Sequence, residues 1–285
     1  MTILLVNQAF PPDWVSSAQH AGDLARALAA RGHDVSVIAS RRAYDSPSTR
    51  FPARCLWRGV NVLRLPATGF GKSAAWRRLA DFASFLAACA ARLLTTPRCD
   101  VIVAMTSPPL LPVLAALCAR LRNSRLVVWA MDLNPDEAVA AGWLRQGSPG
   151  ARLLDALNRF ALRKADAVVV LDRFMQQRVR SKGVAPSRIH VIPPWPHQDA
   201  VCYDPEGRAA FRRKLGVDDQ FVVMYSGNHS PCHPLDTLLQ AARRLARRND
   251  IVFLFAGGGS EQARVREFAR AAGLHVDEFE DLIED

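Results

Sequence analysis

Several common functional signatures are absent from this chain of 285 residues. Its six cysteines show no CxxC pair and no framework spacing, which favours reduced thiols in a cytosolic protein over disulfides. There is no GxSxG elbow, HExxH motif or EF-hand loop, so hydrolase and metalloprotease functions have no support. No signal peptide is visible, because the apolar run at residues 3–6 is short and no basic segment precedes it. We therefore expect a cytoplasmic protein.

The charge that is present is mostly positive and unevenly distributed. The formal net charge is +10, with 26 Lys and Arg against 13 Asp and Glu in residues 1–200, and 11 against 14 in residues 201–285. A basic face attracts nucleic acid, anionic lipid or phosphorylated substrates. Nucleic acid is not expected as the partner, because the basic residues are dispersed and no recognised binding module accompanies them.

Short apolar, β-rich runs alternate with helical stretches along most of the chain. The runs begin at Ile3, Val35, Val60, Val101, Leu126 and Ala167, and helices are expected at residues 17–31, 109–122 and 151–164. Continuous apolar strands between helices are typical of a parallel sheet buried on both faces. We therefore predict an α/β fold with a doubly wound sheet, whose ligand lies at the carboxyl ends of the strands.

The domain boundary is expected just after residues 189–196, where three prolines exclude a helix or a central strand. This gives domains 1–198 and 199–285. In the second domain, strands are expected at residues 221–227 and from Ile251, helices at 234–247 and 260–272, and a weak strand near His275. Residues 277–285 include six acidic side chains, a composition poorly suited to a buried sheet. The second Rossmann-like domain is therefore expected to be incomplete.

Residues 71–98 form one long helical pattern with apolar side chains at spacings of three and four. Arg77, Arg78, Asp81 and Arg92 exclude a membrane-spanning helix, which needs about 20 apolar residues. The pattern suits a helix lying on an anionic membrane surface. A helix that packs on the sheet and exposes ordinary arginines is the alternative, and both stay open.

Gly71-Lys72-Ser73 matches the last three residues of the P-loop motif. Pro66 stands where that motif requires a glycine, so phosphate binding by this loop is not expected.

The loop at residues 9–20 follows the first strand, where a doubly wound domain exposes backbone donors to a ligand. Ser16, Ser17 and His20 could hydrogen-bond a sugar or a phosphate. A capped helix start, with Ser16 or Ser17 as the cap, explains the serines as well.

Residues 131–137 follow another strand and carry Asp132, Asn134, Asp136 and Glu137. Carboxylates in this crevice suit contact with a sugar hydroxyl. Asn-Pro-Asp is also strong turn chemistry, so a plain turn is the alternative.

The loop at residues 226–234 begins the second domain's first crossover. Gly227 permits close backbone approach, and the helix that follows offers its positive end to a pyrophosphate. Zinc binding by His229, Cys232 and His233 is not expected, because a fourth ligand is missing. A second loop at residues 257–260 has three glycines, which let ligand and backbone meet, with a tight turn as the alternative.

The chain contains, in this order, FPPD, LARALAARGHDVSVIAS, AMTSPPLLPVLAAL, MDLNPDEAVAAG, ADAVVVLDRFMQQRVRSKG, IHVIPPW, YSGNHSP and FAGGGSE. The ordered set resembles the family 4 retaining glycosyltransferases from about residue 2 to residue 274. The resemblance implies a GT-B fold, in which the first Rossmann-like domain holds the acceptor and the second mainly holds a nucleotide-sugar donor. It also implies metal-independent transfer with retention, without a cofactor, in which the donor's own phosphate helps take the acceptor proton.

Carried over by position, the resemblance implies a catalytic role for Asp132. The implied acceptor contacts are Phe10, Pro11, Pro12, Ser16, Ser17, His20 and Asn134. The implied donor contacts are Gly227, Asn228, His229, Gly257, Gly258, Gly259 and Ser260.

Three departures from the family pattern are visible. Residues such as Trp14 and Val15 replace the glycine pair that usually follows the two prolines of the first loop. The Lys or Arg that many members place after the second-domain glycine loop is not evident in SGNHSPCHPLD. The downstream Glu-x7-Glu segment, which holds the sugar and the ribose, is absent before Asp285.

The resemblance and the residues together predict a glycosyltransferase. We expect sugar transfer from a nucleotide-sugar to a lipid-linked saccharide in cell-surface polysaccharide synthesis, by a protein that is peripheral on the inner membrane face. The basic first domain and residues 71–98 support the anionic membrane as a partner. The alternative is a truncated, non-catalytic remnant that binds acceptor, membrane or a partner transferase.

Overall fold

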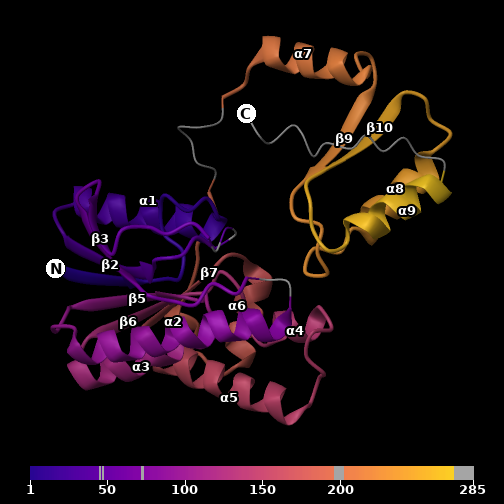
Figure 1. Ribbon diagram of the computed structural model, residues 1–285. Helices are drawn as coiled ribbons and strands as arrows, with labels where there is room; N and C mark the ends of the chain where they lie inside the picture. Colours follow the sequence, from indigo (N-terminus) through magenta and orange to yellow (C-terminus); the bar gives the residue numbers. More distant parts are fainter. Residues whose placement is uncertain (45, 47, 72–73, 196–201, 273–285) are drawn as a thin grey trace. The chain divides into compact units, whose positions relative to one another are not determined.

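A computed structural model describes residues 1–44, 46, 48–71, 74–195 and 202–272 of the chain (Figure 1). The chain forms two compact units, residues 1–139 with 143–197, and residues 140–142 with 198–285. The expected boundary at residues 198 and 199, the weak strand near His275 and the acidic residues 277–285 lie outside the described residues.

The first unit is built on an eight-stranded sheet. In chain order its strands are β1 (Thr2–Val6), β2 (Asp34–Ser40), β3 (Arg54–Trp57), β4 (Val60–Leu65), β5 (Val101–Met105), β6 (Arg125–Trp129), β7 (Ala167–Val170) and β8 (Ile189–Val191). The spatial order is β3-β4-β2-β1-β5-β6-β7-β8, and every pair is parallel except β3 with β4. The strand order reverses between β1 and β5, which is where doubly wound sheets open a ligand crevice.

Helices cover both faces of this sheet. They are α1 (Ser16–Ala30), α2 (Ala75–Thr95), α3 (Leu111–Arg122), α4 (Asp136–Ala140), α5 (Pro149–Lys164) and α6 (Arg173–Ser181), with a 3-10 turn at Pro186–Arg188. Figure 1 shows α1 on one face and α2, α3 and α5 on the other. Side chains alternate along β1, so Leu5 packs in the cluster that contains α1 residues, whereas Leu4 and Val6 pack with Phe85 of α2. The predicted doubly wound sheet, buried on both faces, is confirmed.

Helix α2 divides into two halves with different surroundings. Phe85, Cys89 and Leu93 recur every four residues and are buried on the sheet, and burial raises the pKa of the Cys89 thiol to about 12. In the first half, Trp76 is 60% exposed and Leu79 is 65% exposed. The core-packed alternative therefore holds for the second half, while the first half keeps an uncovered apolar surface.

Within the described ranges, no helix is both long enough and apolar enough to cross a bilayer.

The second unit contains two parallel strands, β9 (Phe221–Ser226) and β10 (Ile251–Ala256). Its helices are α7 (Pro205–Leu215), α8 (Asp236–Leu245) and α9 (Gln262–Ala271). Helices α8 and α9 lie together in Figure 1 and bury Leu239 and Val265 against Phe255 of β10. Helix α7 starts at an Asp204 side-chain cap and ends at Gly216, whose left-handed backbone suits glycine.

Some elements have weak sequence signals. Strand β3 is short and pairs antiparallel with β4 through a turn at Arg58 and Gly59, both of which have positive φ. Strand β8 lies just before the prolines of residues 189–196 and at the sheet edge, where proline is tolerated. The exclusion of a central strand there is confirmed. The six cysteines are free.

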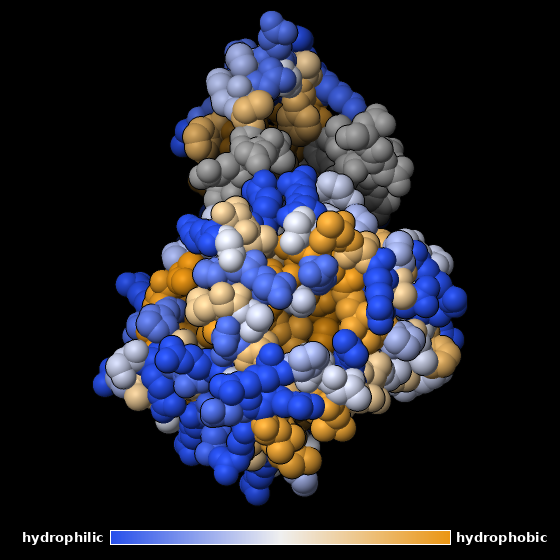
Figure 2. Space-filling view, turned by 90° about the vertical axis from the view of Figure 1, so that its left-hand side faces the viewer, coloured by the Kyte–Doolittle hydropathy of each residue, from blue (hydrophilic) through white to orange (hydrophobic). Residues whose placement is uncertain are grey.

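Figure 2 views the molecule from the side where β1 begins. In the first unit, hydrophobic residues gather in the middle of this face, with hydrophilic residues around and below them. Ligand sites of doubly wound sheets lie at the opposite, carboxyl ends of the strands.

Candidate functional site

The loop after β1 is tied to the neighbouring loops at the carboxyl edge of the first sheet. The Asn7 side-chain amide donates to the Ala9 carbonyl at 2.8 Å. The Gln8 N–H donates to the Ser107 carbonyl at 2.9 Å, and the Gln8 carbonyl accepts from the Ser40 N–H at 2.8 Å. These bonds join the ends of β1, β5 and β2 into one polar rim, on the side of the strand-order reversal.

Phe10 and Pro11 turn toward the protein rather than outward. Phe10 is 1% exposed and meets the Trp57 ring edge-on at 5.2 Å between centroids. The Pro11 carbonyl accepts a 2.6 Å bond from the buried Arg64 guanidinium, whereas Pro12 is exposed. The Phe10 side chain therefore stabilises the core, and only its backbone can approach an acceptor.

Ser16 and Ser17 begin α1, but neither caps it. The cap residue is Val15, which makes no side-chain cap bond, so the expected serine cap is wrong. Within the described residues, neither hydroxyl takes part in a hydrogen bond that would fix its direction. Ser16 is exposed and Ser17 partly buried, so both hydroxyls remain candidates for contact with an acceptor.

His20 lies in an aromatic cluster that sequence reasoning missed. Its ring is 4.8 Å from Trp195 and 6.3 Å from Trp129, and the two tryptophans stack at 5.7 Å. The Trp195 indole N–H donates to Asp23 at 3.0 Å. Trp195 stands 175 residues after His20 in the sequence, so no local spacing could have revealed the cluster.

Asp132 is exposed, three residues after the end of β6. The N–H groups of Met131 and Asp132 both donate to the Thr106 hydroxyl at 3.1 Å. Because Thr106 follows β5, this hydroxyl links two neighbouring strand ends and fixes the backbone that carries Asp132. Thr106 was not among the predicted site residues. Asn134 is partly buried two residues further on.

Asp136 belongs to an ion-pair network rather than to the exposed rim. The ammonium of Lys182, 1% exposed, lies 2.5 Å from Asp136 and 2.6 Å from Asp155. Arg178 also donates to Asp136 at 2.6 Å. Burial alone would raise the pKa of Asp155, but hydrogen bonds from Lys182 and Arg159 outweigh it and lower that pKa. The network anchors the segment that follows Asp132.

In the second unit, two glycine loops pack backbone against backbone after β9 and β10. Gly257 has φ +117°, and a Cβ there would lie 2.2 Å from the Gly227 carbonyl oxygen. Gly259 has φ +142°, and its Cβ would lie 2.2 Å from the His229 carbonyl oxygen. Both positions therefore require glycine. Gly258 meets nothing within 4 Å, and it is exposed together with Asn228 and Ser260.

Hydrogen bonds hold these two loops in register. The Gly227 N–H donates to the Ala256 carbonyl at 3.0 Å, and the His229 N–H donates to the Gly258 carbonyl at 2.9 Å. The His229 carbonyl accepts from the Glu261 N–H at 3.0 Å. The predicted donor residues of the two loops are thus adjacent at the carboxyl ends of two parallel strands.

His229 is 2% exposed and stacks on Tyr225 at 5.6 Å. Burial lowers its pKa, which favours the neutral imidazole. Neither ring nitrogen has a hydrogen-bond partner within the structure as described. Groups of three or more His, Cys, Asp or Glu side chains suited to a metal are absent from the same residues.

The loop that resembles a P-loop end uses its amides internally. The N–H groups of Phe70 and Gly71 both donate at 3.0 Å to the Asp81 carboxylate. Lys72 and Ser73 lie outside the described residues. The two amides are therefore already paired with an acid of α2.

The two units together define a class of protein fold. A doubly wound sheet with a polar carboxyl edge, followed by a second α/β unit with glycine loops after its strands, is the GT-B fold predicted above. Residues 17–195 match the family described as "Glycosyl transferase 4-like domain". The chain belongs to this family.

Comparisons with individual proteins agree with this class. The chain is 26% identical over 296 residues to WcaI of Escherichia coli (strain K12), whose name assigns it to colanic acid biosynthesis as a glycosyl transferase; the match covers 98% of this chain and 71% of WcaI. It is also similar in fold to two solved structures. One is Anabaena HepE in complex with UDP and glucose, with TM-score 0.64, 16% identity and coverage of 98% of this chain and 69% of HepE. The other is sucrose-phosphate synthase from Thermosynechococcus elongatus, with TM-score 0.68, 16% identity and coverage of 98% and 70%.

Proposed function

We propose that this chain transfers a sugar from a nucleotide-sugar to a saccharide acceptor, with retention of the anomeric configuration, in the synthesis of a cell-surface polysaccharide. The observation that carries the proposal is the family membership of residues 17–195. The name of WcaI supports the polysaccharide pathway. The UDP and glucose of the HepE complex support a nucleotide-sugar donor.

The proposed donor site is the pair of glycine loops after β9 and β10. Backbone N–H groups beside glycines can approach a diphosphate closely, since no side chain intervenes. Helix α8 follows the first loop, and its N-terminus adds a favourable electrostatic field for an anion. Gly257 and Gly259 keep the two loops in contact, so they support the diphosphate site indirectly.

The proposed acceptor side is the rim of the first sheet. The acceptor oxygen forms a bond to the sugar C1 while the bond from C1 to the donor phosphate oxygen breaks. The acceptor proton passes to a phosphate oxygen of the leaving nucleoside diphosphate, so charge and atoms balance. Asp132 is proposed to contact a hydroxyl of the reacting sugar, in a position that Thr106 fixes. Such positioning at the reacting centre contributes to the rate.

We further propose that no metal is needed and that the acceptor is lipid-linked. The surface that supports the lipid is Phe70, Trp76 and Leu79, which are 50%, 60% and 65% exposed. The Phe70 and Trp76 rings lie 5.8 Å apart, and the Arg77 guanidinium lies 5.4 Å from the Trp76 ring. Aromatic and apolar side chains beside cations suit the headgroup region of an anionic membrane.

The test of transfer uses labelled UDP-glucose, UDP-galactose and GDP-mannose with a bacterial lipid extract as acceptor. Label should enter the lipid fraction from one donor, survive chelation of divalent metals, and yield a product with the donor's anomeric configuration by NMR. Asp132→Asn should remove incorporation, and Asp34→Asn, at the opposite edge of the sheet, should not. Absence of incorporation from every donor would favour the non-catalytic alternative.

The membrane surface is tested separately by sedimentation with vesicles containing phosphatidylglycerol. A Trp76→Ser, Leu79→Ser double variant should lose binding. Leu153→Ser on α5, where the leucine is 61% exposed, is the matched control and should bind as the wild type does. Equal binding by all three proteins would remove Trp76 and Leu79 from the account.

A further inference from the structure

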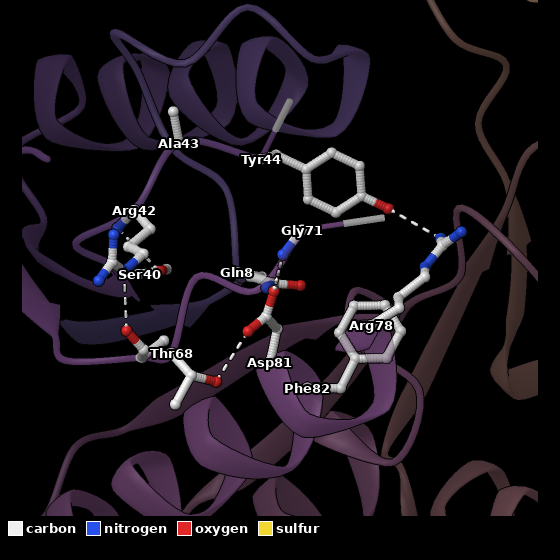
Figure 3. A pocket seen from close by; sticks show the side chains of 11 residues that line it. Gln8, Ser40, Arg42, Ala43, Tyr44, Thr68, Gly71, Arg78, Asp81 and Phe82 are labelled. Carbon is white, nitrogen blue, oxygen red and sulfur yellow. Dashed lines mark hydrogen bonds between the residues drawn. The ribbon is translucent and has the colours of Figure 1, made fainter. Parts of the chain in front are cut away.

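A small cavity opens at the carboxyl edge of the first sheet, beside the rim described above (Figure 3). Its described lining comes from the ends of β1, β2 and β4 and from the first turns of α2. Its polar side chains include Gln8, Arg42, Tyr44, Thr68, Arg78 and Asp81. The cavity offers about 30 Å³ to the centres of water-sized groups, and one water needs roughly 10–15 Å³. It therefore has room for a small polar group such as a phosphate or a carboxylate.

Two arginines flank this cavity on opposite sides of Gln8 and Asp81 (Figure 3). Arg78 is partly buried and donates from one guanidinium nitrogen to the Tyr44 hydroxyl at 3.1 Å. Its guanidinium also lies 5.3 Å from the Phe82 ring. Within the residues the structure covers, no carboxylate pairs with Arg78. A guanidinium has five N–H donors, so several remain for a ligand.

Asp81 does not neutralise this cationic pair. Its carboxylate accepts from the Thr68 hydroxyl at 2.7 Å and from the Phe70 and Gly71 N–H groups at 3.0 Å. Both carboxylate oxygens are thus engaged by the loop. Asp81 is also the one acidic residue in the described lining. Among the described lining residues, two arginines therefore stand against one carboxylate.

The position of Arg42 is set by close packing. Its Nε donates to the Ala67 carbonyl at 3.0 Å. A Cβ at Gly69 would lie 2.6 Å from the Arg42 Cδ and 2.7 Å from its Nε. Any side chain at residue 69 would therefore displace the guanidinium. A substitution at Gly69 would therefore move this arginine without removing its charge.

Gln8 completes the lining with an amide. Its Oε1 is buried and has no hydrogen-bond partner in the described structure, and Figure 3 shows the amide between the two arginines. A buried amide oxygen without a partner is costly, so a bound polar group or water is expected there. An amide that rotates by half a turn exchanges its oxygen and its NH₂ group, so Gln8 can present either an acceptor or a donor.

We propose that this cavity binds an anionic group of the acceptor, a phosphoryl or carboxylate group, through Arg42, Arg78 and Gln8. The inference rests on the proposed function, because it assigns the acceptor to the first unit. Arginine forks suit both anions and form charge-assisted bonds with them. The anion comes either from a lipid phosphate or from an acidic sugar. Gly71 lines the cavity next to the exposed Phe70, so the lipid surface proposed above lies beside it.

Three small probes test the proposal by ligand-observed NMR on the full chain: butyl phosphate, methyl glucuronide and the neutral methyl glucoside. We expect an anionic probe to bind, and its affinity to fall about tenfold or more in Arg78→Gln and Arg42→Gln. Arg152→Gln, an exposed position on α5, is the control. Binding of butyl phosphate alone assigns a lipid phosphate, binding of methyl glucuronide alone assigns an acidic sugar, and binding of both supports the shared anion site.

A second variant protects the test against misfolding. Gly69→Ala keeps both arginines but displaces Arg42, so it should also weaken binding of the anionic probe. Gly150→Ala, where an added Cβ meets nothing within 4 Å, should not. The proposal is overturned if no anionic probe binds, if methyl glucoside binds equally well, or if the arginine and Gly69 variants bind like the wild type.

Failure of this site and failure of the proposed function give different results. UDP and GDP titrations of the same proteins report on the second unit. Nucleotide binding that survives in Arg78→Gln, with no anion binding in the wild type, overturns the cavity assignment alone. Arg78-dependent anion binding without nucleotide binding or sugar transfer overturns the proposed function alone.

Discussion

The two units offer different chemistry at the carboxyl ends of their strands. In the first unit the edge is built from side chains, with Asp132, Arg42 and Arg78 held by neighbouring loops. In the second unit the edge is built from backbone, and Gly257 and Gly259 allow contacts that any Cβ would prevent. Side chains can be exchanged to suit different acceptors, whereas backbone amides suit the diphosphate that nucleotide-sugars share. Under the proposed function, this difference would let one architecture keep its donor chemistry while its acceptor changes.

The largest expected effect concerns the side-chain edge. Asp132→Asn should lower the sugar transfer rate by about 10²–10³-fold, the range for removing one positioned polar contact at the reacting centre. Donor affinity should stay unchanged in a nucleotide titration. An Asp132→Asn protein with normal transfer would break the assignment of reaction chemistry to this edge.

The next effect concerns how that edge is supported. Lys182→Met should lower the free energy of unfolding by about 3 kcal/mol, near the lower end for breaking a buried ion pair, because Arg178 and Arg159 still face the two carboxylates. Urea denaturation measures this. Arg248→Gln disrupts an exposed pair with Asp250 and should leave the urea midpoint in place. Equal midpoint shifts in the two variants would mean that the burial of Lys182 adds nothing to the stability of the ion pair.

The backbone edge is tested by a pair of neighbouring glycines. Gly257→Ala should weaken nucleotide binding at least about tenfold, or 1.4 kcal/mol, since the new Cβ pushes against the Gly227 carbonyl. Gly258→Ala should bind nearly normally, because its added methyl group meets nothing. Calorimetric titration with UDP and GDP measures both. Similar losses in the two variants would contradict a role for loop contact.

The smallest effect is a pH dependence in the second unit. Burial lowers the pKa of His229, so the unfolded chain binds the extra proton as pH falls through the ordinary histidine value near 6.5. Stability should therefore rise between pH 5.5 and 7.5, and less so in His229→Gln. Urea midpoints at the two pH values measure this, and NMR titration of the imidazole should give a midpoint below 6.5. A midpoint above 6.5 would contradict the neutral, buried ring.

The sequence predicts the main strands well because their apolar runs are continuous. It predicts the edges less well, since these depend on contacts between distant residues. Phe10 lies in a loop motif yet packs on Trp57, which stands 47 residues away. Thr106 supports Asp132 across 26 residues.

The cavity, too, depends on residues that are distant from one another in the sequence. Arg42 and Arg78 belong to different elements and share no motif. The GKS segment carries a motif, yet its loop amides pair with Asp81. A local pattern can therefore mark a loop without showing which partner its amides take.

Amide hydrogen exchange with and without UDP tests the division between the two edges most directly. The account predicts that UDP slows exchange at residues 226–230 and 257–262 of the second unit and leaves residues 8–20 and 40–44 of the first unit unchanged. Protection confined to the first unit, or no protection at either edge with UDP or GDP, would contradict it.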